Sequence, residues 1–166
     1  HAAAHPTAGR ADVLAPAGAK STTSIVREVV THWRARAEEL VSLGIARSKV
    51  VMDPGLGFAK SAEESETLVR ELARVVEEVG APVLIGASRK SFLTLVDRDA
   101  PLPKHRLGSS IAIAIAAVDR GALLLRVHDV RATRQAILWT ARLTRGGPGS
   151  RAPFGDLRAH REAPDA

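Results

Sequence analysis

The stretch PVLIGASRKS, residues 82–91, decides the fold class because an apolar run passes directly into a polar turn. Residues 82–86 are apolar and include two β-branched side chains, as buried strands often do. Residues 87–91 carry two serines and two cations, a composition typical of a loop. We therefore predict a strand at 82–86 that leads into a polar loop.

Two further segments repeat this arrangement. Residues 49–52 form a short β-branched run that ends at Asp53, where a proline and a glycine follow. Because proline cannot donate to a β-ladder, we expect the first strand to end at Asp53. Residues 122–127 form a third strand candidate, which leads into His128.

Helical spacing fills the intervals between these strands. Apolar residues recur every three or four positions over residues 25–41, 68–79 and 132–143. Ser61 and Glu64 fit a capping box at the start of the second helix, which we expect to stop near Gly80. Asp129 is placed to cap the last helix.

Two shorter segments complete the pattern. Residues 92–96 form a short apolar helical segment. Residues 109–121 alternate isoleucine and alanine, which is compatible with a helix or a strand. We favour a helix because the alanine-rich run exceeds a typical strand and ends at Gly121.

Strands that alternate with helices indicate βαβ units, and hence an α/β fold with a parallel sheet covered by helices. Such sheets bind ligands in the loops at the carboxyl ends of their strands. Asp53, the loop 88–91, Arg126 and His128 all lie at such ends. We therefore expect these residues to meet on one face.

Composition fits a folded domain and excludes several classes. The 166 residues are 45% hydrophobic and 25% charged, without cysteine, which excludes disulfides and thiolate metal sites. No apolar run approaches the roughly 20 residues of a membrane-spanning helix. With no signal peptide visible, we expect a cytoplasmic protein without a membrane partner.

The net charge of +6 is concentrated at one end of the chain. Residues 131–166 hold seven arginines and three acids, which leaves the rest nearly balanced. Aromatic residues make up 3% of the chain, too few for a base-stacking surface. We therefore expect no nucleic-acid partner, and an anionic small substrate stays compatible with these charges.

Motif spacing removes other readings. Lys60 stands where a dinucleotide fingerprint needs its third glycine, and Lys90 stands where a hydrolase elbow needs its last one. No Gly-Lys-Ser/Thr phosphate loop occurs. His1 and His5 lie in an irregular segment without further ligands, so we expect no metal site there.

The strand ends offer complementary chemistry. The Asp53 carboxylate can accept paired hydrogen bonds from a guanidine-like edge, although it could also serve only as a loop cap. The loop 88–91 opens a helical segment, where free N–H groups favour an anion and Arg89 and Lys90 would add to that preference. Arg126 and His128 lie on one side of an extended strand and suit an anion. Their alternative is an Asp129–Arg pair beside a surface histidine.

Three aromatic residues require an interpretation. Phe58 lies in a glycine-containing loop, where it could wall a pocket or tuck under its own turn. Trp33 and Trp139 lie on apolar helix faces, so we expect both in the core.

Three long segments resemble the dihydropteroate synthase family. They are Met52 to Lys60, Pro82 to Phe92 and Leu125 to Val130, in the same order and spacing. Residues 106–109 also resemble the family's approach to its seventh helix, so the resemblance covers about residues 21–143. It implies a (β/α)₈ TIM barrel and a transferase of folate biosynthesis, which joins 4-aminobenzoate to 6-hydroxymethyl-7,8-dihydropterin diphosphate and releases diphosphate.

The resemblance also implies roles in holding the substrates. Asp53 would hold the amino-pyrimidine edge of the pterin, and Lys90 would hydrogen-bond the pterin ring. Phe58 would line the aminobenzoate pocket, and Ser91 would receive the aminobenzoate carboxylate.

For the leaving group, the resemblance implies that Arg126 and His128 bind the diphosphate, with Arg126 also against the pterin face. Lys90, Arg126 and His128 are therefore the catalytic candidates. Departure of diphosphate would leave a pterin-methyl cation, which the amine attacks. The family also implies Mg²⁺, whose ligand would lie in a preceding half of the enzyme, and a homodimer at full length.

A complete barrel typically takes about 250 residues, more than this chain has. We therefore expect a partial barrel, the C-terminal half with about strands 6 to 8 and their helices. Residues 1–20 would form an irregular loop after the fifth strand, 21–145 the half-barrel, and 146–166 a disordered basic tail. Such a fragment would be inactive alone.

Two alternatives stay open. One is a methyltransferase-type pterin-binding barrel, which shares the aspartate contact with the pterin but has no leaving diphosphate to bind. The other is a non-catalytic half-barrel subunit that completes a barrel with a separately encoded half.

Overall fold

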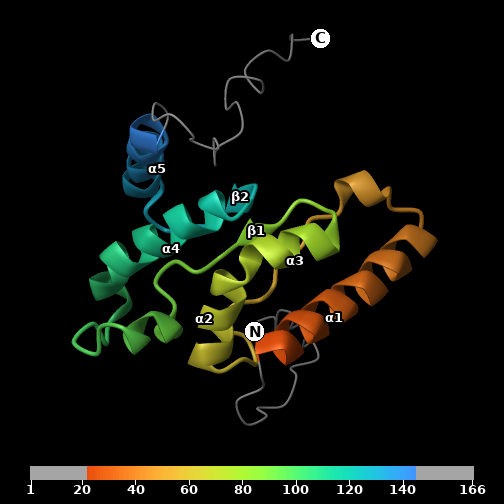
Figure 1. Ribbon diagram of the computed structural model, residues 1–166, viewed down its shortest axis with the longest axis horizontal. Coiled ribbons are helices and arrows are strands. Elements are labelled where there is room, and N and C mark those ends of the chain that lie inside the picture. The colour runs from red at the N-terminus through yellow and green to blue at the C-terminus, as the bar shows by residue number, and fades with distance from the viewer. Residues whose placement is uncertain (1–21, 145–166) are drawn as a thin grey trace, which may run out of the picture.

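The structure is a computed structural model that describes residues 22–144. Helices dominate this part of the chain and surround a small parallel sheet (Figure 1). The irregular segment expected at 1–20 and the tail expected at 146–166 lie outside the described residues. Within residues 22–144, none of the helices is both long and apolar enough to cross a membrane.

The elements alternate much as the sequence predicts. The α-helices are α1 (Thr22–Ser42), α2 (Ala62–Arg70), α3 (Leu72–Val79), α4 (Leu107–Asp119) and α5 (Val130–Thr144). The strands are β1 (Leu84–Ile85) and β2 (Leu124–Leu125). Three short 3₁₀ helices cover Arg47–Lys49, Ser91–Leu95 and Pro103–Arg106.

The sheet is parallel, and its register matters for the site. Leu84 lies opposite Leu124 and Ile85 lies opposite Leu125, so partners are 40 positions apart. The strand predicted at 49–52 is reduced to a single parallel bridge between Met52 and Val83. Met52 nevertheless exchanges two backbone hydrogen bonds with the neighbouring segment, through the carbonyl of Pro82 and the amide of Leu84. The three predicted strands therefore lie side by side, although all three are shorter than expected.

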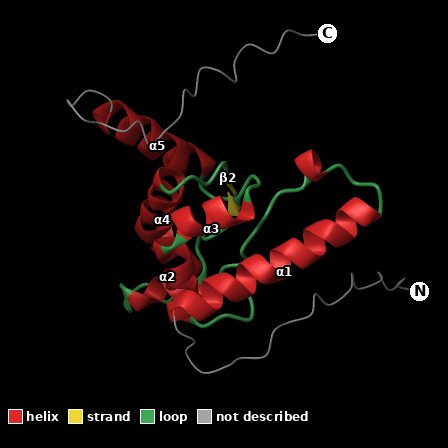
Figure 2. Cartoon of the chain, turned by 45° about the vertical axis from the view of Figure 1, so that its right-hand side comes forward, coloured by secondary structure: helices red, strands yellow, loops and turns green. Residues whose placement is uncertain are grey.

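The core forms where α1 covers α2, α3 and the sheet. The apolar stripe of α1 is buried from Ile25 to Ala37, and Trp33 is 8% exposed, as predicted for a core residue. Leu68, Leu72 and Val75 meet it from α2 and α3, and Met52, Val83 and Ile85 meet it from the sheet. In Figure 2 α1 runs in front of α2 and α3, with which it is in contact.

The predicted capping box begins α2. Ser61 Oγ accepts from the Glu64 amide at 3.1 Å, and Glu64 Oε2 accepts from the Ser61 amide at 2.8 Å. The single helix expected up to Gly80 is interrupted at Glu71, whose ψ of 13° departs from helical geometry. The chain then ends α3 at Gly80, which takes the left-handed conformation that favours glycine.

The alternating segment 109–121 is helical, which confirms the helix rather than the strand. α4 continues to Asp119, and Ala114 and Ala117 are buried. The short helix expected at 92–96 is the five-residue 3₁₀ helix Ser91–Leu95.

The prediction that Trp139 lies in the core is wrong. Trp139 is 56% exposed and Leu143 is 77% exposed on α5. Figures 1 and 2 both place α5 on the far side of the molecule from α1, and its contacts run to α4. The apolar stripe of α5 is real, but no described element covers it.

Candidate functional site

Residues from the first and third strand ends meet directly, as the sequence predicts. Arg126 Nη2 donates to Asp53 Oδ2 at 3.0 Å, across 73 positions of sequence. The other oxygen, Asp53 Oδ1, accepts from the Gly55 amide at 2.8 Å, which fixes the carboxylate against its own turn. The Arg126 side chain is 60% exposed, so it is accessible to a ligand.

Gly86 allows Arg126 to lie across the end of β1. A Cβ atom at Gly86 would come within 2.8 Å of Arg126 Nη2 and 3.1 Å of Arg126 Nε. Contacts this short require the guanidinium to move. The lack of a side chain at position 86 therefore sets the path of Arg126 toward Asp53.

Lys90 lies between the first and second strand ends. Its ammonium donates to the Leu56 carbonyl and lies 3.9 Å from the centroid of the Phe58 ring, a cation–π contact. Burial lowers the pKa of Lys90, Asp53 opposes that lowering, and the charges of Arg126 and Lys60 add to it. Lys90 is therefore a partly buried cation near the Asp53 carboxylate.

His128 is held by a serine of the second loop. Ser88 Oγ lies 3.0 Å from His128 Nδ1 and accepts from the His128 amide at 3.2 Å. Ser88 is 7% exposed, whereas His128 is exposed. The ring is therefore anchored on its Nδ1 side.

Arg89 does not reinforce an anion site, which corrects the prediction. Its Nε and Nη2 donate to the two carboxylate oxygens of Asp129 at 3.0 and 2.7 Å. The hydrogen bond with Asp129 raises the pKa of Arg89, and the same bond lowers the pKa of Asp129. Asp129 does pair with an arginine, as the alternative held, but with Arg89 and not with Arg126.

The backbone of Arg89 is constrained as well. Its φ of 59° is uncommon for a residue with a side chain. Ser110 Oγ accepts from the Arg89 amide at 2.9 Å, and Arg106 Nη1 donates to the Arg89 carbonyl at 2.9 Å. Arg106 is itself 7% exposed and also donates to the carbonyls of Ala100 and Pro101. These bonds hold the turn between Ser88 and Lys90.

The predicted site residues are thus partly brought together. Asp53, Arg126, Lys90 and Phe58 form one group, and His128 follows Arg126 by two positions. Ser91 is exposed, and no hydrogen bond within residues 22–144 joins its side chain to this group. It begins a 3₁₀ helix of five residues, the same length as the helical segment expected at 92–96.

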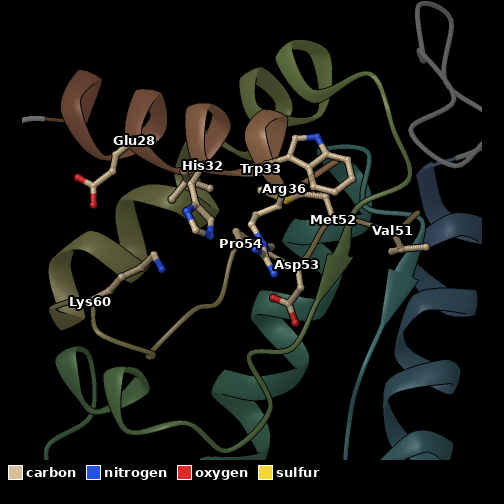
Figure 3. Close-up of a pocket in the computed structure, with 10 residues that line it drawn as sticks. Glu28, His32, Trp33, Arg36, Val51, Met52, Asp53, Pro54 and Lys60 are labelled. Atoms are coloured by element: carbon tan, nitrogen blue, oxygen red, sulfur yellow. The ribbon is translucent and has the colours of Figure 1, made fainter. Parts of the chain in front are cut away.

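A cavity of about 250 Å³ lies beside Asp53 (Figure 3). It is lined by α1, through Glu28, His32, Trp33 and Arg36, and by the segment 51–54 and Lys60. Asp53 therefore stands between this cavity and Arg126.

Metal-ligating side chains do not cluster in the part of the chain that the structure describes. Within residues 22–144 no group of three His, Asp or Glu side chains could hold a metal ion. The ligand of the magnesium ion that the resemblance implies would lie in a preceding half of the enzyme.

The sequence did not predict the roles of the residues that position the site. Gly86, Ser88, Ser110 and Arg106 act through contacts with other side chains or loops, which no local motif shows. One signal was present for two of them, because Gly86 and Ser88 precede Arg126 and His128 by the same 40 positions that relate β1 to β2.

The arrangement suits a ligand with two different ends. The Asp53 carboxylate can accept from a guanidine-like edge, while Arg126, Lys90 and His128 can donate to an anion. Arg126 and Asp53 are hydrogen-bonded to each other in this structure. A ligand would therefore have to break this bond and replace it with its own contacts.

Comparison with known proteins finds relatives in the family that the sequence motifs resemble. Dihydropteroate synthase of Neisseria meningitidis serogroup C is 42% identical over 120 residues, which are 70% of this chain and 41% of that protein. Dihydropteroate synthase of Synechocystis is 37% identical over 111 residues. The chain thus spans less than half the length of these relatives.

Solved structures agree with the sequences. Dihydropteroate synthase of Xanthomonas albilineans in complex with 7,8-dihydropteroate matches with a TM-score of 0.72 and 35% identity, over 80% of this chain and 49% of that chain. The Coxiella burnetii enzyme in complex with pteroic acid matches with a TM-score of 0.71 and 32% identity, over 80% and 47%. The family profile described as "Pterin binding enzyme" matches residues 10–128. The chain therefore belongs to the pterin-binding enzyme family.

Proposed function

We propose that the chain is part of a dihydropteroate synthase, which condenses 4-aminobenzoate with 6-hydroxymethyl-7,8-dihydropterin diphosphate. The observation that carries this proposal is the meeting of Asp53 with Arg126 and Lys90 at the ends of neighbouring strands. Similarity to synthases solved with 7,8-dihydropteroate and with 4-aminobenzoic acid supports it.

In this proposal the pterin displaces Arg126 from Asp53. The Asp53 carboxylate then accepts hydrogen bonds from the amino-pyrimidine edge, and Lys90 donates to the pterin ring. The exposed ring of Phe58 lines the aminobenzoate pocket, and Ser91 receives the aminobenzoate carboxylate.

The cations act on the leaving group. Arg126 and His128 hold the diphosphate while the bond between the pterin methylene carbon and the diphosphate oxygen breaks. The electron pair leaves with the diphosphate, and the amine nitrogen of 4-aminobenzoate bonds to the resulting cation and loses a proton. Preorganised donors favour this step because they stabilise the charge that develops on the leaving group.

The cations also favour a synthase over a methyltransferase-type barrel. A methyl donor carries no diphosphate, so it gives no reason to have the cations Arg126 and Lys90 beside one carboxylate, with His128 two positions after Arg126. The Asp53 contact alone is compatible with either enzyme.

We also propose that residues 21–145 are the C-terminal half of the barrel. Met52 pairs with Val83 on one side, and the other edge of the segment 51–54 faces the cavity under α1, where a preceding strand would lie (Figure 3). At the other end of the sheet Leu123 is 72% exposed beside β2, where the first strand of the N-terminal half would pair to close the barrel. A homodimer of the complete enzyme is part of this proposal.

Joining the chain to the N-terminal half of the Neisseria meningitidis relative tests the function. We expect the chimaera to form 7,8-dihydropteroate, and its Asp53→Asn variant to lose most of that activity because the pterin edge loses its acceptor. A folded chimaera that binds both substrates and forms no product would contradict the proposal.

The chain alone should show no turnover. It offers Asp53, Lys90, Arg126 and His128 but leaves the site open on the side of the cavity. Product formation by the purified 166-residue chain, measured with both substrates, would contradict the half-barrel proposal.

A further inference from the structure

Ser88 is placed to control the histidine of the third strand end. The segments that follow β1 and β2 keep the register of these strands. Ser88 and His128 are 40 positions apart, as Ile85 and Leu125 are. Arg89 and Asp129 repeat the same separation in their ion pair. The contact between Ser88 and His128 therefore keeps the register of the sheet, although both residues lie beyond the ends of its strands.

The Ser88 hydroxyl has a fixed set of partners. Its oxygen accepts from the His128 amide at 3.2 Å and lies 3.0 Å from His128 Nδ1. Within residues 22–144 these are the hydrogen bonds that the structure gives to this side chain. Ser88 is 7% exposed, so water has little access to it.

These partners decide which atom carries the proton. A hydroxyl has one hydrogen to donate, and a buried hydroxyl hydrogen without an acceptor is costly. The amide of His128 can only donate, so Nδ1 is the acceptor within reach. If Nδ1 carried the proton instead, the hydroxyl hydrogen would have no partner.

We propose that Ser88 is a positioning residue that holds His128 as the tautomer with a bare Nδ1 and a protonated Nε2. The ring then turns Nε2–H, a donor, away from the serine and toward solvent. A donor at that place suits an anion and would not suit a cation. The assignment to the leaving diphosphate rests on the proposed function, whereas the tautomer does not.

Long-range ¹H–¹⁵N spectra of the full chain test the tautomer, because bare and protonated ring nitrogens have distinct shifts. Spectra are taken at alkaline pH, where histidine rings are neutral, and His128→Gln assigns the signals. We expect a bare Nδ1 in the wild type, a mixture of tautomers in Ser88→Ala, and the wild-type pattern in Ser88→Thr. Ser109→Ala, at a half-buried serine of α4, is the matched control.

A protonated Nδ1 in the wild type would overturn the proposal. An unchanged tautomer in Ser88→Ala would also overturn it, provided that the remaining amide signals show a folded protein. A merely structural role of Ser88 would change stability without changing the ring nitrogens.

Titration with inorganic diphosphate separates the two proposals. We expect Ser88→Ala to bind about two- to tenfold more weakly than the wild type, the worth of one hydrogen bond, and Ser109→Ala to bind equally well. If the wild type has the expected tautomer but binds no diphosphate, the assignment of His128 to the leaving diphosphate fails and the role of Ser88 stands. If diphosphate binds and the tautomer is the other one, the role of Ser88 fails alone.

Discussion

Gly86 shows how a residue without a side chain can direct one that has a long side chain. The Arg126 side chain passes over the backbone at Gly86 to reach Asp53. The space that a Cβ atom would take at Gly86 is therefore occupied by the guanidinium. The pair that results is exposed, and exposed ion pairs contribute about 0–1 kcal/mol to stability. Its role is therefore to place two charged groups, not to hold the fold together.

The Gly86→Ala variant should separate the contribution of the Arg126–Asp53 pair to stability from its role in placing the two charged groups. The new methyl group would displace a flexible guanidinium rather than backbone, so we expect the free energy of unfolding to change by less than about 1 kcal/mol. Binding of inorganic diphosphate, measured by calorimetry, should weaken several-fold because Arg126 is displaced.

Gly108→Ala is the control, since a Cβ there meets nothing within 4 Å. It should leave diphosphate binding unchanged and stabilise α4 slightly, because alanine is the better helix former. Wild-type affinity in Gly86→Ala would show that the path of Arg126 does not depend on Gly86.

At the scale of elements, a helix cap, a side-chain hydrogen bond and an ion pair hold the loops that carry the site. The capping box begins α2, and Ser65 of α2 accepts from the Gly57 amide at 3.0 Å. The start of α2 thereby supports the loop that carries Phe58. On the other side, the Arg89–Asp129 pair ties the loop after β1 to the start of α5.

Ser61→Ala should destabilise the protein by about 1 kcal/mol, because the Glu64 amide loses its acceptor. Urea unfolding measures this loss. Ser48→Ala, at an exposed serine in the 3₁₀ helix Arg47–Lys49, should have almost no effect. Equal losses in the two variants would mean that the cap contributes nothing.

Asp129→Asn should lower stability at neutral pH, because it breaks the bidentate bond to Arg89. The folded pKa of Asp129 is below its ordinary value of about 3.9, so its contribution is present above that value and is lost as the pH falls through the folded pKa. The difference between variant and wild type should therefore close in acid. Unfolding series at several pH values measure it.

Asp99→Asn changes an exposed carboxylate in a loop and serves as the control. Its stability should follow that of the wild type at each pH. A constant gap between Asp129→Asn and the wild type down to acid pH would refute the assigned role of the charge.

The sequence predicted the elements better than their contacts. Periodicity and turn residues located the helices, and the Asp-Pro-Gly turn after Met52 located the end of the first strand segment. Local patterns could not show that Arg89 turns to Asp129, because both residues lie in loops whose approach depends on the register of β1 and β2. The break at Glu71 had no sequence signal either.

At the scale of the molecule, the apolar surface exposed on α5 is the main departure from the usual burial of apolar side chains. The prediction for Trp139 was wrong because periodicity shows that a helix has an apolar face, not what covers it, and Leu143 on the same face is exposed as well. Val130 and Leu138 are also exposed on α5, although helical spacing places them on other faces than Trp139. Large exposed apolar patches favour association.

The chain should therefore self-associate in solution. We expect sedimentation velocity to show association that rises with concentration, and Trp139→Glu to reduce it because a charge is costly to bury in an interface. Val96→Glu, at a 91% exposed position outside α5, should leave association unchanged. Identical association of the two variants would place the contact elsewhere.

The common separation of 40 positions limits where the chain can change in length. One residue added between Ile85 and Gly86 would shift Gly86, Ser88 and Arg89 out of register with their partners at once. Arg126 would no longer pass over a glycine, and His128 would lose its contact with Ser88. One residue added between Val96 and Asp99, in an exposed loop, would leave all three pairings in place. Homologues should therefore tolerate insertions in that loop and exclude them from the few residues that follow β1.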